Sequence, residues 1–215
     1  MTGPEHMPPE GYLGTAARIT SGPAPELIEA GYELEIADAP LLHRGLTLAD
    51  LAHLTELVDC GALAPGEAAP LCAVLLDLLD KPAADFPYDP VYGDAYNSRE
   101  RELERALGPA AGRLHLGRTR REAGRIAFRL AVRDKLLGLH GDVADLASEL
   151  ARQARRHAVT LWADHTYLQP AQPSTFGHYL GGFAEQAVRH LDRIEAAYAR
   201  ADTSPGGAGA VGGTR

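Results

Sequence analysis

The sequence contains little cysteine and almost no lysine. Its two cysteines, Cys60 and Cys72, do not form a C-x-x-C pair, so they predict no metal cluster. Each follows an apolar helical pattern, which favours buried free thiols. Lys81 and Lys135 are the only lysines, so arginine supplies almost all of the positive charge. We attach no function to that bias.

The chain also lacks a basic patch, a long apolar run and a signal-peptide pattern. Its 215 residues carry a formal net charge of −8, which argues against a nucleic-acid partner. No apolar run approaches the ~20 residues that cross a bilayer. The segment from Met1 to Glu10 holds acid and proline where a signal peptide has a charged and then an apolar region. We therefore expect a cytoplasmic protein without a membrane partner.

The hydrophobic pattern is helical almost throughout, and no strand pattern stands out. We expect an all-α fold in which an extended arm (1–22) precedes an N-terminal helical domain (23–110) and the start of an incomplete bundle of long helices (111–215). The expected helices cover 25–44, 47–60 with Thr47 as N-cap, 66–80, a segment from Asn97 or Ser98 to 108, 120–157, and 174–201 with Ser174 as N-cap. Gly138 and Gly141 leave open whether 120–157 is one helix or two.

A glycine-rich stretch near the end, Gly207 to Gly212, matches the G-x-G-x-x-G pattern of dinucleotide sites. That pattern needs a strand before it and a helix after it, and here a helix precedes it. We therefore interpret the stretch as a close-packed turn, with a flexible tail as the alternative.

Two segments carry the most specific pattern in the chain. Residues 164–173 read D-H-T-Y-L-Q-P-A-Q-P, and residues 112–120 read G-R-L-H-L-G-R-T-R. They resemble signature segments of the fumarase/aspartase superfamily, and in particular the T-H-L-Q-x-A-Q-P and A-G-K-L-H-x-x-R-S-R-N-D runs of its argininosuccinate lyase branch. The resemblance runs without a gap over 94–122 and more loosely over 11–213.

The resemblance implies a carbon–nitrogen lyase of the amidine-lyase type, as in arginine biosynthesis. Such an enzyme eliminates fumarate from argininosuccinate or an analogous N-substituted aspartate, with neither a cofactor nor a metal. The reaction needs a base for a C–H proton, donors that stabilise the carbanion, and an acid for the departing nitrogen. The two carboxylates of the substrate call for arginine forks and neutral donors.

The first motif supplies candidates for one carboxylate. Thr119 and Arg120 stand where the family has its Ser-Arg pair, immediately before a long helix, and a helix N-terminus favours anions. Arg121 replaces the family's asparagine and Glu122 its aspartate, which puts the identity of the substrate in question. From the residues alone, Arg118, Arg120 and Arg121 also fit a solvated basic turn.

The second motif supplies neutral donors, Thr166, Gln169 and Gln172, for the other carboxylate. Tyr167 replaces the histidine of the family's acid–base machinery, and a phenol donates a hydrogen bond at neutral pH but is a poor base. His165 is the alternative if its side chain points inward. The catalytic candidates of this motif are therefore Tyr167 and Thr166.

A second histidine of the family is also replaced by tyrosine. Tyr96 stands where argininosuccinate lyases have the substrate-contacting histidine of D-I-H or D-V-H, so it is a further candidate for substrate binding. The parallel changes at Tyr96 and Tyr167 indicate a repurposed pocket, such as one with altered recognition of the leaving group. Coincidence is the alternative.

The family's third signature, a G-S-S-x-M-P-x-K-x-N-P loop whose serine acts as base, has no counterpart in this sequence. We therefore expect the chain by itself to be inactive, as a fragment, one part of a split enzyme or a pseudoenzyme. The family assembles its active sites from different subunits of a tetramer. The expected partners are thus a small dicarboxylate and either further copies, as in a homotetramer, or a companion chain. The alternative function is a non-catalytic helical assembly or interaction subunit.

Overall fold

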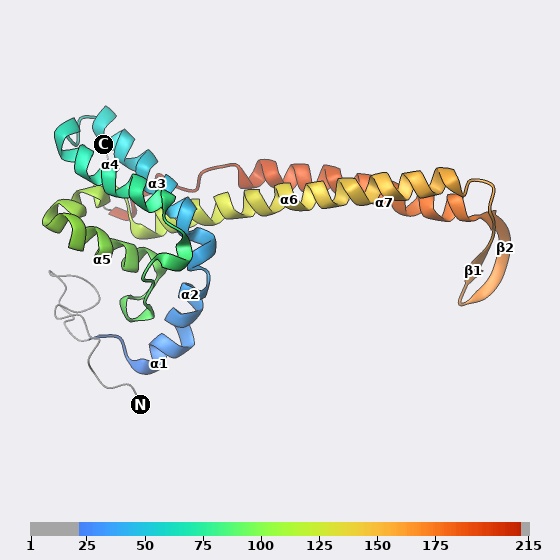
Figure 1. The fold of residues 1–215 in the computed structure, drawn as a ribbon, viewed down its shortest axis with the longest axis horizontal. Coiled ribbons are helices and arrows are strands. Elements are labelled where there is room, and N and C mark those ends of the chain that lie inside the picture. Colours follow the sequence, from blue (N-terminus) through green and yellow to red (C-terminus); the bar gives the residue numbers. More distant parts are fainter. Residues whose placement is uncertain (1–21, 212–215) are drawn as a thin grey trace. The chain divides into compact units, whose positions relative to one another are not determined.

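The computed structural model describes residues 22–211, and these residues form two compact units (Figure 1). The first unit comprises 22–131 together with 204–211, and the second comprises 132–203. The predicted domain boundary at residue 110 stays a prediction, and the predicted arm at 1–22 lies almost wholly outside the described residues. Within 22–211, no helix is long and apolar enough to cross a membrane.

The first unit is built from short and medium helices. In chain order these are α1 (Pro25–Leu27), the π-helical turn η1 (Ile28–Tyr32), α2 (Glu33–Ala37), α3 (Ala39–Asp59), α4 (Pro65–Asp80), the 3₁₀ turns η2 (Ala83–Asp85) and η3 (Pro90–Tyr92), α5 (Ala95–Leu107), the 3₁₀ segment η4 (Gly108–His115) and η5 (Gly209–Val211). Helix α6 (Arg120–Arg156) begins in this unit.

The second unit contains the rest of α6, strands β1 (Leu161–Thr166) and β2 (Gln169–Thr175), and helix α7 (Phe176–Ala201). Helix α6 runs unbroken for 37 residues, so Gly138 and Gly141 do not divide it. The predicted all-α class with long helices of a bundle is confirmed. The N-cap of α7 is Thr175, one residue after the predicted cap, and its side chain accepts the N–H of His178.

Leucine side chains form the main core of the first unit. Buried leucines of α3 and α4, such as Leu54, Leu71 and Leu75, pack against Leu103 of α5 and Leu114 of η4. A second cluster joins α3 to the start of α6, and most of its members are small: the buried ones are Ala39, Leu46, Ala49, Ala95, Tyr96, Ala123 and Ala127. The small side chains let the two backbones approach closely.

The two cysteines are free, as the sequence predicts, and both are half-buried. Cys72 of α4 packs against the leucine core. The thiol of Cys60, at the end of α3, lies 3.6 Å from the carbonyl oxygen of Leu57. The expected complete burial of the two thiols is thus wrong, and only Cys72 packs against the core.

Thr47 is not an N-cap, which corrects the sequence-based prediction. It lies inside α3, fully buried, where its hydroxyl donates to the carbonyl of His43 one turn earlier. A threonine that bonds to the backbone this way satisfies its own hydroxyl without ending the helix. The helix predicted to start at Thr47 therefore begins at Ala39. Helix α5 begins at Ala95, ahead of the predicted start at Asn97 or Ser98, because Asp94 caps it.

The prediction that the chain contains no strands is wrong. Residues 161–175 form an antiparallel hairpin in which Thr166 pairs with Gln169. Two prolines in β2, Pro170 and Pro173, disrupt the alternating pattern that identifies a strand. The two loop residues, Tyr167 and Leu168, both have positive φ, at 48° and 64°. Such a two-residue turn normally takes Asn-Gly, so these residues hold a strained backbone.

The second unit buries small side chains and exposes large ones. Its parts of α6 and α7 lie side by side (Figure 1), joined by ion pairs from Arg133 to Asp202 and from His140 to Glu195. The buried residues of these helices in this unit are small: Ala147, Gly177, Ala184 and Ala187. Large apolar side chains remain exposed: Leu137, Leu139, Leu146, Tyr179, Phe183 and Val188. An exposed apolar surface of this kind is typical of an interface.

The close approach of α3 and α6 yields a test. A Cβ added at Gly45 would lie 2.8 Å from the Cα of Ala127, so Gly45→Ala should lower the free energy of unfolding by about 1–3 kcal/mol through overpacking. Gly138→Ala is the matched control, because open space surrounds this exposed helical glycine. It should raise stability by about 0.5–1 kcal/mol. Urea denaturation measures both, and equal effects would contradict the packing assigned to Gly45.

Candidate functional site

The site begins at the turn that precedes α6. Glu122 accepts the N–H of Thr119 at 3.0 Å, and the Thr119 hydroxyl lies 3.5 Å from the same carboxylate oxygen. A hydroxyl residue followed three positions later by a glutamate that reaches back to its N–H is typical of a helix start. The pairing fixes the backbone of Thr119 and places Arg120 and Arg121 in the first turn of α6.

A cavity of about 280 Å³ lies beside this first turn. Its lining includes three predicted substrate-binding residues, Tyr96, Arg120 and Arg121. Arg120 pairs with Asp94 at 3.1 Å, and Arg121 lies 3.7 Å from the same carboxylate. Asp94 therefore orients both arginines while it also caps α5. The structure thus brings together the first-motif arginines and the tyrosine that replaces the family's histidine.

Tyr96 lines the cavity, but its hydroxyl bonds to groups inside the protein. The residue is 4% exposed; its O–H donates to Asp50 at 3.1 Å and accepts from Arg118 at 3.0 Å. Burial raises the pKa of the Tyr96 phenol, and the negative charge of Asp50 raises it further. The phenol is therefore held neutral, with its hydrogen-bonding capacity directed to these two residues.

Asp50 is the centre of a buried charge cluster that the sequence analysis missed. Its two oxygens accept from Arg118 at 2.5 Å and from Arg99 at 3.3 Å, and Asp50 and Arg99 are fully buried. Arg118 also donates to the carbonyl of Ala49 at 3.0 Å. Arg118 thus does not belong to a solvated turn, which corrects that alternative for this residue. The available signal was an aspartate among the apolar residues of α3, since a charge at such a position needs a partner.

The glycine-rich stretch is tied to the same turn. Glu122 accepts the N–H groups of Gly207 and Gly209 at 2.8 and 3.1 Å. These bonds, together with that from Thr119, lower the pKa of the Glu122 carboxyl from 4.5 to about 2, with the Thr119 N–H as the largest cause. The described part of the stretch is therefore a turn that is fixed by hydrogen bonds from its N–H groups to the Glu122 carboxylate. Gly212 lies outside the described residues.

The second-motif residues lie in the other unit, on the β1–β2 hairpin. Thr166 and Gln169 pair at its closed end, and Tyr167 in the loop is 97% exposed. The amide of Gln172 donates to Asp164 at 3.3 Å. The hairpin thus presents a phenol, a hydroxyl and two amides to the surroundings.

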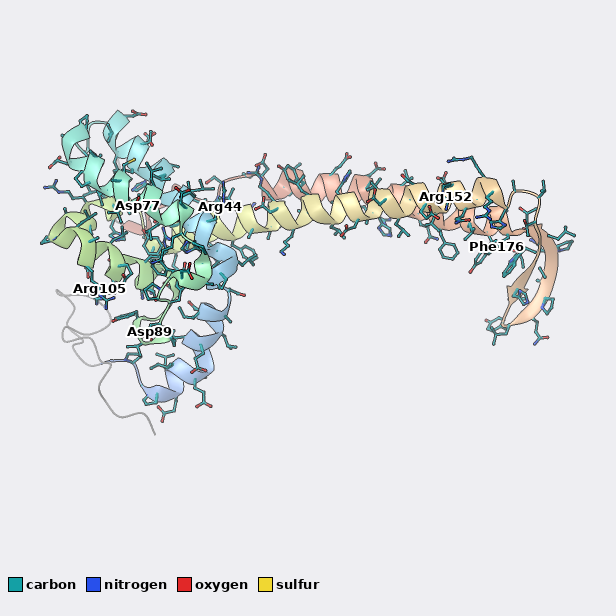
Figure 2. All side chains as sticks on the ribbon, in the orientation of Figure 1. Arg44, Asp77, Asp89, Arg105, Arg152 and Phe176 are labelled. Carbon is teal, nitrogen blue, oxygen red and sulfur yellow. The ribbon has the colours of Figure 1, made fainter. Side chains whose placement is uncertain are left out.

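His165, the alternative acid–base residue, is exposed on β1 and lies edge-on to Trp162. Trp162 also contacts Phe176 and Tyr179, and Figure 2 labels Phe176 where β2 passes into α7. These aromatic contacts hold the base of the hairpin against α7. His165 thus packs with Trp162, next to the aromatic contacts at the base of the hairpin.

Comparison with known proteins assigns the chain to a family. A model of the family described as "Lyase" matches residues 45–215. The chain belongs to this lyase family. An argininosuccinate lyase from Chelativorans sp. is 34% identical over 165 residues, which cover 76% of this chain and 35% of the relative. An argininosuccinate lyase from Methanoculleus marisnigri is 34% identical over 168 residues, with 78% and 34% covered.

These relatives confirm the resemblance to the argininosuccinate lyase branch of the fumarase/aspartase superfamily. The chain spans about a third of the length of the curated relatives that it matches. Among solved structures, a variant of EDDS lyase with bound fumarate is 29% identical, with a TM-score of 0.73 over 94% of this chain and 40% of that one. The long helices of this lyase-family chain thus follow an established fold.

The buried charge cluster of this lyase-family chain predicts a large effect of one substitution. Asp50→Asn removes the only carboxylate that Arg99 and Arg118 share in the described structure, so two buried guanidinium groups lose their counter-charge. We expect the free energy of unfolding to fall by about 3–5 kcal/mol in urea denaturation. Asp59→Asn, at the exposed end of the same helix, should change it by less than about 0.5 kcal/mol. A small effect at Asp50 would exclude the cluster as a determinant of stability.

Glu122 predicts a pH dependence. Its folded-state pKa lies below the ordinary value, so its stabilising contribution is complete above about pH 4.5 and disappears as the pH falls towards about 2. The free energies of unfolding of the parent and of Glu122→Gln should therefore differ at pH 6 and converge as the pH falls through this range. Denaturation at a series of pH values measures the difference. Glu56→Gln, on the exposed surface of α3, should show no such convergence.

Proposed function

We propose that this chain supplies part of the active site of a lyase that eliminates fumarate from an N-substituted aspartate, such as argininosuccinate or an analogue. The observation that carries the proposal is the cavity in which Arg120 and Arg121 lie beside Tyr96. Two arginine side chains next to a helix N-terminus match a carboxylate of a succinyl compound. The likeness to argininosuccinate lyases supports the same reaction class.

The proposed chemistry divides the substrate between the two motifs. Arg120 binds one carboxylate as a fork, and Thr119 keeps the helix start in place. The second-motif donors bind the other carboxylate, where negative charge develops as a base removes the neighbouring C–H proton; they are Thr166, Gln169 and Gln172. The electron pair of that bond forms the C=C bond of fumarate, and the C–N bond breaks. The Tyr167 hydroxyl protonates the departing nitrogen.

The base is the part of this reaction that we do not assign to the chain. In the family that this chain resembles, a serine loop supplies the base, and that loop has no counterpart among these 215 residues. We propose that another polypeptide segment provides it, in a companion chain or a longer assembly. The 215-residue chain should then need that partner for turnover.

Assembly also accounts for the exposed surfaces. The arginine cavity and the donor hairpin lie in different units. The apolar side chains that α6 and α7 leave exposed suit a bundle with further helices. We therefore include a homotetramer, or association with a companion chain, in the proposal, with the hairpin of one copy completing the cavity of another.

The decisive test is dicarboxylate binding to the assembled protein. Arg120→Lys should weaken the binding of succinate about ten- to hundred-fold in calorimetry, because an ammonium group cannot reproduce a bidentate fork. Arg155→Lys is the matched control, since this exposed arginine lies in the last turn of α6, and should bind succinate as the parent does. If Arg120→Lys binds succinate as tightly as the parent does, Arg120 does not bind the ligand and belongs to a solvated turn instead.

Tyr167→Phe separates proton donation from binding in the same experiment. It should leave the succinate affinity unchanged but lower the release of fumarate, followed by absorbance with the companion chain present. A loss of affinity would instead make the phenol a ligand of the substrate.

A further inference from the structure

The cavity that holds Arg120 contains a third arginine that neither motif identified. Arg125 lines the same cavity, one turn after Arg121 on α6. Residues four apart share one face of a helix, so Arg121 and Arg125 are neighbours beside Arg120. Among the described residues, Arg125 forms no ion pair, and Arg121 forms only long ones, at 3.5 Å to Glu35 and 3.7 Å to Asp94.

The three arginines of the cavity differ in how strongly they are paired with acidic residues. Arg120 has the shortest pair, with Asp94 at 3.1 Å, and Asp94 is mostly buried. The pair between Arg121 and Glu35 is exposed on both sides, so it is weak and readily exchanged. Two like charges on one helix face repel each other, and an anion placed between them relieves that repulsion. Arg121 and Arg125 are therefore available to a ligand.

We infer that Arg121 and Arg125 form a subsite for a carboxylate carried by the leaving group. The inference rests on the proposed function, in which Arg120 holds the succinyl part of the substrate. The leaving group would then be an amine that bears a carboxylate, as in an N-(carboxyalkyl)aspartate. Its acid group lies between the two arginines, near the positive end of the α6 dipole.

The acidic residues of the cavity are consistent with this inference. Glu35, Asp38 and Asp94 balance the three arginines, so the lining as a whole is neutral. With a neutral amide at position 121, as in the argininosuccinate lyase pattern, the same lining would be net negative and would favour a cationic leaving group. Arg121 removes that preference. The carboxylate of Asp38 suits the protonated nitrogen that an N-alkylated aspartate carries.

Two ligands that differ in a single carboxylate test the subsite. N-methylaspartate and N-(carboxymethyl)aspartate share the succinyl part and the protonated nitrogen, and only the second has the additional acid. Calorimetry on the assembled protein should show about ten-fold tighter binding of N-(carboxymethyl)aspartate. Arg125→Gln should reduce that preference and leave the affinity for N-methylaspartate unchanged, and Arg121→Gln should also reduce the preference. Both side chains are exposed, so thermal melting should show folded variants.

The controls separate this inference from the proposed function. Arg155→Gln removes an exposed arginine outside the cavity and should keep the full preference. Suppose that Arg120→Lys weakens the binding of N-methylaspartate, but the parent binds both ligands equally well. The subsite is then wrong, and the proposed function stands. A preference that persists without Arg121 and Arg125 also overturns the subsite. If neither ligand binds, both proposals fail.

Discussion

Asp50 is a single carboxylate between two arginine side chains, and the first unit is organised around it. Its oxygens hold Arg99 of α5 and Arg118 of the turn before α6, and it accepts the hydroxyl of Tyr96. A buried charge is costly unless it is paired, so these side chains constrain one another's positions. Helices α3 and α5 and the turn before α6 thereby meet at a defined geometry, and the candidate cavity forms beside them.

The turn before α6 transmits this constraint to the cavity. On one side of the turn, Arg118 pairs with Asp50. On the other side, Glu122 accepts the N–H groups of Thr119 and of the glycine-rich segment. Arg120 lies between these two anchors at the start of α6. The arginines that line the cavity thus extend from a backbone that is fixed on both sides.

The extent of successful prediction differs from element to element. The apolar periodicity of α6 and α7 is a local property, so the bounds of these long helices follow closely from the sequence. The hairpin was missed because its prolines disrupt a strand pattern and because its turn uses Tyr167 and Leu168 in a conformation that glycine normally adopts. Thr47 was misplaced as a cap, since nothing local shows that its hydroxyl bonds back to His43.

The sequence by itself determined the helical class and the lyase family, because short motifs and apolar spacing are encoded over a few neighbouring positions. Only the tertiary structure decided which charges are buried. Asp50 and Arg118 are 68 residues apart, and the cavity that Arg125 shares with Arg120 and Arg121 forms only when α6 packs beside residues of α2 and α5. Whether an arginine is solvated, paired or open to a ligand depends on such distant neighbours, which no local pattern specifies.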